Sequence, residues 1–173
     1  MKKIISLVLC FILIFSFAAC GEQNPEKQAY EELINGLEEQ KMVAINPRVD
    51  EDSKGQKYIA ADVKNKTNTE VTDVVLAFAV WNYKGQPVII KSQNNPRNTN
   101  YEVRMSLQSS VKIPPADTWN GIGGIFLNKN CPSIKYVKAI VLSCKMGGVT
   151  YKNPHYKKWR ENHINKPLEE WMK

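Results

Sequence analysis

Apolar residues along the middle of the chain recur with a period of two. Between residues 43 and 146, short runs rich in Val, Ile and aromatic residues alternate with polar positions, as in strands that bury one face. Polar or glycine-containing turns separate these runs, and Gly147-Gly148 indicates a short hairpin. We expect seven or eight strands, which include residues 43–49, 57–64, 71–83, 87–92, 104–113, 124–127 and 134–146. Since no helical pattern interrupts the series, it predicts an antiparallel β-sandwich, with residues 93–103 as an exposed loop.

The segment before the first strand has helical spacing instead. Over residues 24–42, Asn24 is a suitable N-cap and Pro25 suits the first helical position. One apolar stripe follows, formed by Tyr30, Leu33, Ile34 and Leu37, although Gly36 weakens the helix. The stripe is compatible with a stalk that self-associates and with a helix docked on the sandwich.

Helical character returns at the C-terminus. Pro154 can start a helix in which Tyr156, Trp159 and His163 share one face, and Pro167 breaks it before a second short turn over residues 168–171. We expect residues 153–173 to form a helical strap that packs on the sandwich. The predicted organisation is therefore a leader over 1–19, a helical stalk over 20–41, a β-sandwich over 42–152 and the strap over 153–173.

The N-terminus reads as an export signal. Lys2 and Lys3 precede 16 uncharged residues, fewer than the roughly 20 that span a bilayer, and Ala18-Ala19 stands before Cys20. This pattern resembles a bacterial lipobox, which implies cleavage before Cys20 and attachment of fatty acids to that residue. An uncleaved N-terminal anchor is the alternative. Both place the remainder at the extracytoplasmic face of a bacterial membrane.

Charge adds a possible partner. The chain has 24 Lys and Arg against 17 Asp and Glu, and loss of Lys2 and Lys3 with the leader leaves 22 against 17, or +5. A basic domain outside the membrane can attract anionic lipid or wall polymer, although a simply solvated surface is the alternative. Its location argues against nucleic acid as a partner.

Two sequence strings resemble known bacterial surface domains. Val63-Lys64-Asn65-Lys66-Thr67, followed by Phe78-Ala79-Val80-Trp81-Asn82 and Gly85, resembles the FxLYD-type immunoglobulin-like domains of bacterial lipoproteins. Residues 150–156 are similar to the end of a set of bacterial extracellular domains of unknown function. The resemblance implies an immunoglobulin-like sandwich and surface anchoring, and it implies no activity. Independently, the alternation predicts that Phe78 and Val80 enter the core and that Asn82 and Gly85 form a turn.

Catalytic and metal-binding patterns are weak. His155 and His163 would lie about 12 Å apart on a helix, too far to share a metal ion. Asp50, Glu51 and Asp52 could bind calcium, but a solvated turn explains them as well. We expect no cofactor and no metal. Cys131 and Cys144 are not expected to form a disulfide, because a strand between them would hold the thiols apart.

The C-terminal strap supplies the candidate recognition surface. Trp159 lies among Lys157, Lys158 and Arg160, a combination that suits a lipid interface or a polyanion. In the alternative arrangement, Trp159 packs on the sandwich and only the cations face water. The sequence thus predicts a lipid-anchored, non-catalytic binding or accessory module whose partner is an envelope protein or an anionic wall polymer. A small envelope enzyme acting on wall polymer is the alternative function.

Overall fold

The computed structural model describes residues 24–121 and 124–173, so the predicted signal segment and Cys20 lie outside the described residues. The chain divides into two compact units, residues 1–32 and 33–173. Helix α2 (Pro25–Glu38) begins in the first unit, where Asn24 Oδ1 accepts a hydrogen bond from the Glu26 amide at 2.9 Å, the predicted cap. None of the described helices has the length and apolar character needed to cross a bilayer.

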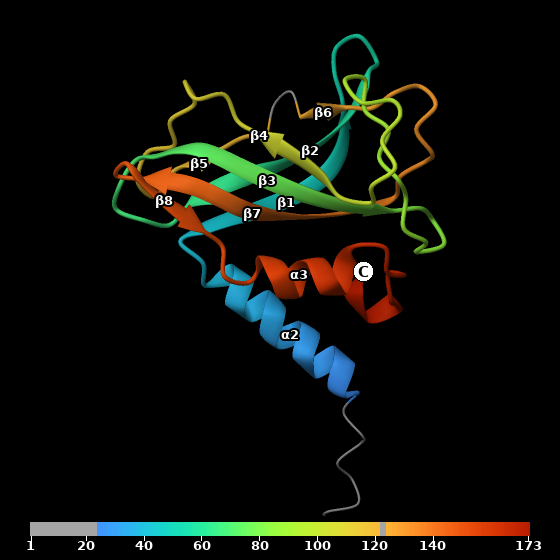
Figure 1. Ribbon diagram of the computed structural model, residues 1–173, viewed down its shortest axis with the longest axis horizontal. Helices are drawn as coiled ribbons and strands as arrows, with labels where there is room; N and C mark the ends of the chain where they lie inside the picture. The colour runs from blue at the N-terminus through green and yellow to red at the C-terminus, as the bar shows by residue number, and fades with distance from the viewer. Residues whose placement is uncertain (1–23, 122–123) are drawn as a thin grey trace, which may run out of the picture. The chain divides into compact units, whose positions relative to one another are not determined.

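The second unit is built on two antiparallel sheets (Figure 1). In the first sheet, β2 (Lys57–Asn65) pairs with β1 (Met42–Glu51) and with two short strands, β5 (Thr118–Trp119) and β6 (Ile125–Phe126). The order in the second sheet is β4 (Val103–Ser106), β3 (Val71–Trp81), β7 (Tyr136–Met146) and β8 (Val149–Lys152). The fold is therefore a mainly β, antiparallel sandwich with an N-terminal helix and short C-terminal helices, as the alternation predicts.

The core lies between the sheets and follows the period of the strands. Ile59, Ala61 and Val63 of β2 alternate into it from one side. Phe78 and Val80 of β3 enter from the other side, which confirms the orientation predicted for them. Burial of these side chains is the main favourable contribution to the stability of the unit.

The outer face of the second sheet is also buried. Helix α3 (Tyr156–His163) and a 3-10 turn, η1 (Glu170–Met172), belong to the segment that covers it. The Trp159 side chain is 1% exposed and stacks on the His163 ring with 5.0 Å between centroids. His163 in turn meets the ring of Trp81 edge-on at 6.0 Å, and Trp81 Nε1 donates to the Lys166 carbonyl at 2.7 Å. The predicted packing of the C-terminal strap on the sandwich is thus confirmed.

The end of α2 packs in the same region. Leu33 is 1% exposed, and Ile34 and Leu37 line a cavity of about 160 Å³ together with Trp159. A Cβ at Gly36 would lie 2.9 Å from the His155 ring, so the glycine that weakens the helix also permits this close contact. Within the second unit, residues 33–38 are therefore docked.

Of the predicted strands, the one over residues 87–92 is wrong and the one over residues 104–113 is too long. Residues 87–92 make only isolated bridges, at Pro87 and Ser92, so they form no continuous ladder with a neighbouring strand. The strand predicted over 104–113 is β4, which ends at Ser106, where the chain turns so that the Val111 amide bonds to the Gln108 carbonyl. The hairpin at Gly147-Gly148 is confirmed, with φ of 55° and 83°.

Asparagine side chains build the predicted turns. Asn82 Oδ1 accepts hydrogen bonds from the amides of Lys84 and Gln86, and Gly85 has φ 72°, as expected for this turn. Asn65 is fully buried, and its Oδ1 accepts from the Thr67 amide while its Nδ2 reaches backbone carbonyls of the 113–114 segment. The two segments that resemble FxLYD-type domains, residues 63–67 and 78–85, therefore have a folding role.

The buried carboxylate of Asp62 holds β1 and Gly121 onto β2. Asp62 accepts from Arg48 at 2.9 Å, from Asn46 at 3.0 Å and from the Gly121 amide at 2.9 Å. Burial acts to raise the pKa of Asp62, but these hydrogen bonds outweigh it and the pKa is lowered. At Gly124, a Cβ would lie 2.0 Å from the Ile59 carbonyl oxygen, so only glycine allows this approach to the strand.

The two described cysteines should differ in reactivity. Both are free thiols, with Cys144 buried in β7 and Cys131 half-buried in the loop before it. Burial raises the pKa of Cys144 to about 11 and also raises that of Cys131, against an opposing effect of Lys91. Iodoacetamide should label Cys131 first and Cys144 only after denaturation, because the thiolate is the reactive form. Peptide mapping measures the order, and a peptide that joins the two by a disulfide would contradict the structure.

Truncation of Trp159 should destabilise the protein strongly. Trp159→Ala removes a fully buried indole, which costs about 3 to 5 kcal/mol and lowers Tm by roughly 10 °C. Lys158→Ala, at an exposed position of the same helix, is the matched control and should shift Tm little. Equal melting temperatures of the two variants, measured by calorimetry on the full chain, would show that the strap contributes no stability.

Candidate functional site

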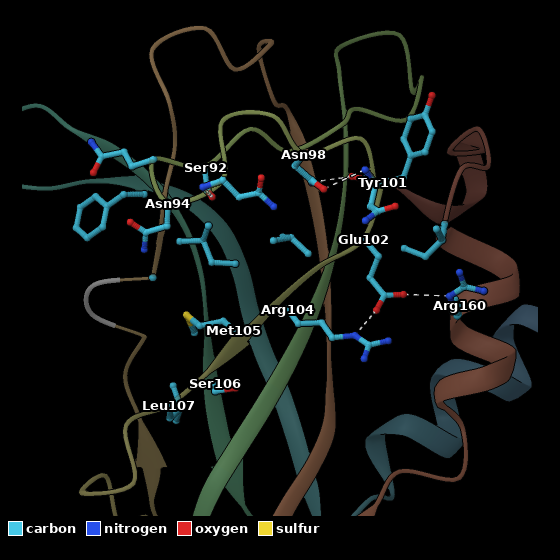
Figure 2. A pocket seen from close by; sticks show the side chains of 18 of the residues that line it. Ser92, Asn94, Asn98, Tyr101, Glu102, Arg104, Met105, Ser106, Leu107 and Arg160 are labelled. Carbon is cyan, nitrogen blue, oxygen red and sulfur yellow. Dashed lines mark hydrogen bonds and ion pairs between the residues drawn. The ribbon is translucent and has the colours of Figure 1, made fainter.

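A cleft of about 1240 Å³ lies where the edges of the two sheets meet. Edge strand β4 lines one side, and Trp119 of β5 and Phe126 of β6 line the other. The loop over residues 92–101 closes one end, and α3 contributes Arg160 (Figure 2). The cleft thus forms where neither sheet continues with a further hydrogen-bonded strand.

A carboxylate held by two arginines is the central feature of the cleft. Glu102 accepts from Arg104 Nε at 2.7 Å and from Arg160 Nε at 3.2 Å, as the dashed lines of Figure 2 show. The Tyr156 hydroxyl donates to the same carboxylate at 2.8 Å. These contacts tie the end of the loop and β4 to helix α3, across more than fifty residues of sequence.

The two arginines keep part of their binding capacity. Their side chains are 56% and 57% exposed, whereas that of Glu102 is only 9% exposed. Arg104 Nη2 also donates to the Tyr156 hydroxyl at 2.8 Å. Nη1 of Arg104 and both terminal nitrogens of Arg160 have no partner among the described residues. Two positive charges against one negative charge leave this cluster at +1.

The electrostatics of the cluster agree with its geometry. The hydrogen bond to Glu102 raises the pKa of Arg104, with burial as a smaller opposing effect. Burial and the bond to Glu102 raise the pKa of Tyr156. Both groups therefore keep their protons at neutral pH, and the site presents donors rather than a general base.

Amide side chains line the same cleft as the arginines. Asn98 is used internally, since its Nδ2 donates to the Ile90 and Asn100 carbonyls and so shapes the loop. The other amide side chains that line the cleft make no hydrogen bond to the described residues: Gln93, Asn94, Asn95, Asn100, Gln108 and Asn165. Each carries both donors and an acceptor, so the loop offers paired hydrogen-bonding groups to a ligand.

The structure separates the four residues of the predicted recognition surface. Trp159 is buried against His163 and is not accessible, because the sheet face beneath α3 requires an apolar cover. Lys157 and Lys158 are exposed on α3 but do not line the cleft, whereas Arg160 does. Glu102 and Arg104 were not singled out from sequence, where they are two charged residues at a loop end with no local pattern.

Other candidate chemistry resolves into structural contacts. Asp50 and Glu51 end strand β1, where Asp50 pairs with Arg48 at 3.2 Å. Asp52 starts the turn that follows, and its Oδ1 accepts from the amides of Lys54 and Gln56. In the described part of the chain, no group of three or more His, Cys, Asp and Glu side chains is arranged to hold a metal ion.

Comparisons with known proteins agree with the fold and leave the activity open. Residues 58–166, more than half of the chain, match the model of a family described as "Family of unknown function (DUF5780)". An X-ray structure of a hypothetical protein from Peptoclostridium difficile 630 is similar, with a TM-score of 0.54 and 11% identity over 76% of this chain and 95% of that chain. At this identity the likeness concerns the fold alone. No curated protein matches the chain.

His163 should make the stability depend on pH. Burial, with a smaller contribution from the nearby charge of Lys138 on β7, lowers its pKa from 6.5 to about 4, despite the opposing effect of the bond with the Trp159 carbonyl. Between these values the unfolded chain binds a proton that the folded chain does not, so stability falls as the pH drops from 6.5 to 4. The loss is on the order of 3 kcal/mol.

The pH dependence can be assigned by substitution. His163→Phe should lose less stability than the wild type between pH 7 and pH 4, whatever its stability at pH 7. His155→Gln, at the half-exposed histidine, should keep the wild-type dependence. Urea unfolding at both pH values measures the difference, and parallel behaviour of wild type and His163→Phe would refute the assignment.

Proposed function

Because the chain belongs to the DUF5780 family, whose description assigns no activity, we propose from its own features that it is a lipid-anchored binding module of the bacterial envelope. The observation that carries this proposal is the cleft in which Glu102 holds Arg104 and Arg160 beside unpartnered amide side chains. The domain acts outside the cytoplasmic membrane and binds a component of the envelope without altering it.

The anchoring part of the proposal rests on the N-terminal sequence. Lys2 and Lys3, the short uncharged run and Ala18-Ala19-Cys20 together form a lipoprotein signal. A single acyl chain binds a membrane only weakly, so Cys20 carries at least two chains in this proposal. The FxLYD-like strings support the same placement, since domains of that type occur in bacterial lipoproteins.

The binding part rests on the donor groups of the cleft. Exposed guanidinium nitrogens and amides are suited to recognition, and the two guanidinium groups are held by strand β4 and helix α3 rather than by loops. The predicted alternative, an enzyme acting on wall polymer, would use two carboxyl groups on opposite sides of a glycosidic bond. Among the described lining residues Glu102 is the one carboxylate, and two arginines occupy it. We therefore favour binding over hydrolysis.

Lipid attachment to Cys20 can be tested in cells. Bacteria that express the full chain are fed an alkyne-labelled fatty acid, and the protein is fractionated. Wild type should carry the label in the membrane fraction, while Cys20→Ala should lose it. Cys131→Ala is the control and should keep it. A mature wild-type N-terminal peptide without an acyl mass increment would refute the anchor.

Binding and hydrolysis can be distinguished with isolated cell-wall fragments. The full chain, purified in mild detergent, should sediment with the fragments and release no soluble sugar or peptide from them. Release that grows with time would establish the enzyme instead. Failure to sediment with fragments from several bacterial wall types would refute the envelope-binding role.

A further inference from the structure

We propose that the ligand of the cleft is an anionic glycan, a hydroxyl-rich chain that carries phosphate or carboxylate groups, with Arg104 and Arg160 as its anion-binding residues. This proposal rests on the proposed binding function and adds the chemical class of the ligand. Glu102 is a positioning residue that orients both arginines without touching the ligand.

The two arginines favour a ligand that carries an oxyanion. Arg160 uses only Nε for Glu102, and its two terminal nitrogens make no hydrogen bond to a described residue, so both remain as donors for a ligand. Arg104 keeps Nη1 in the same way. Planar guanidinium donors match carboxylate and phosphate oxygens, and charge-assisted bonds of this kind are stronger than neutral ones. The net charge of +1 in the cluster leaves one charge to be neutralised by a ligand.

The remaining lining indicates hydroxyl groups and sugar rings. The amides of Gln93, Asn94 and Asn100 can each donate to and accept from a hydroxyl group. Half-exposed Tyr101, Trp119 and Phe126 add apolar ring surface to the same cleft. Small-molecule sites are usually lined mainly by apolar groups, whereas here polar side chains share the lining about equally with apolar ones such as Val103, Met105 and Ile125.

The size of the cleft indicates an oligomer. Its volume of about 1240 Å³ exceeds the roughly 300 to 1,000 Å³ of typical small-molecule pockets. The exposure of both arginines shows that the site is open to solvent rather than enclosed. A segment of an extended chain can therefore lie in it and continue into the solvent.

Glu102 has two opposing effects on the affinity of the cleft for an anion. Removing a negative charge should strengthen anion binding if attraction by net charge were the only effect. The carboxylate holds Arg104, Arg160 and Tyr156 at hydrogen-bonding distance, so its loss also frees two long side chains that must then be ordered by the ligand. We expect the loss of orientation to outweigh the gain in charge.

The test compares defined probes on the full chain in detergent. A glycerol phosphate oligomer supplies phosphate, an oligogalacturonate supplies carboxylate, and a dextran oligomer of similar length is neutral. Calorimetric titration should show binding to at least one anionic probe, and the preferred one identifies the source of the anion. Dextran should not bind, and a fivefold rise in salt concentration should markedly lower the affinity for the anionic probe.

Charge-matched variants separate the cleft from the rest of the surface. Arg104→Gln and Arg160→Gln should each lower the affinity for the anionic probe about tenfold or more, as expected for loss of a charge-assisted hydrogen bond. Lys157→Gln and Lys158→Gln remove the same charge from exposed positions of α3 and should change affinity less than about twofold. Glu102→Gln should weaken binding, and Tm measured for each variant reports whether it still folds.

Several outcomes would overturn the proposal. Equal losses of affinity for the lysine and arginine variants would mean that the probe is attracted by the basic surface as a whole and not bound in the cleft. Binding of dextran, or of an acidic peptide in preference to both anionic probes, would assign another ligand class. Stronger binding by Glu102→Gln would exclude its positioning role. If wall fragments retain the full chain but none of the anionic probes competes, this inference fails while the envelope-binding function stands.

Discussion

Burial of one sheet on both faces is the constraint on which the rest of the structure depends. The β3 and β7 pair turns Phe78 and Val80 toward the first sheet and Trp81 toward the C-terminal segment. His163 stacks on Trp159 and meets Trp81, so three large rings exclude water from the outer face. Without this cover the sheet would expose an apolar patch large enough to promote association. The C-terminal helix is therefore part of the fold and not an appendage.

The same contact places the cleft. Trp159 and Arg160 are neighbours on α3, and docking of the first residue in the core carries the second to Glu102 at the edge of the sandwich. Glu102 in turn lies directly before β4, and the register of β4 with β3 fixes the position of Glu102 along the sheet edge. The arginine pair is thus supported by two rigid elements, so a ligand would have little ordering of the protein to induce.

Local chemistry made much of the fold predictable. Most strands follow from alternation, the turn at Asn82 and Gly85 follows from side-chain and backbone geometry, and α2 starts at its asparagine cap. Errors occurred where a segment looks like a strand but has no complete partner, as at residues 87–92. Strand propensity describes a half-buried surface, and only the neighbouring chain decides whether a ladder forms.

The sequence by itself determined the β class, the helical ends and the basic charge, because these depend on composition and on residues close together in the chain. Only the tertiary structure decided that Trp159 is internal and that Arg160 joins a cleft. Glu102 and Arg160 are 58 residues apart, and no local pattern links them. Their contact follows from strand register and from helix docking on an apolar sheet face, which are long-range consequences of packing.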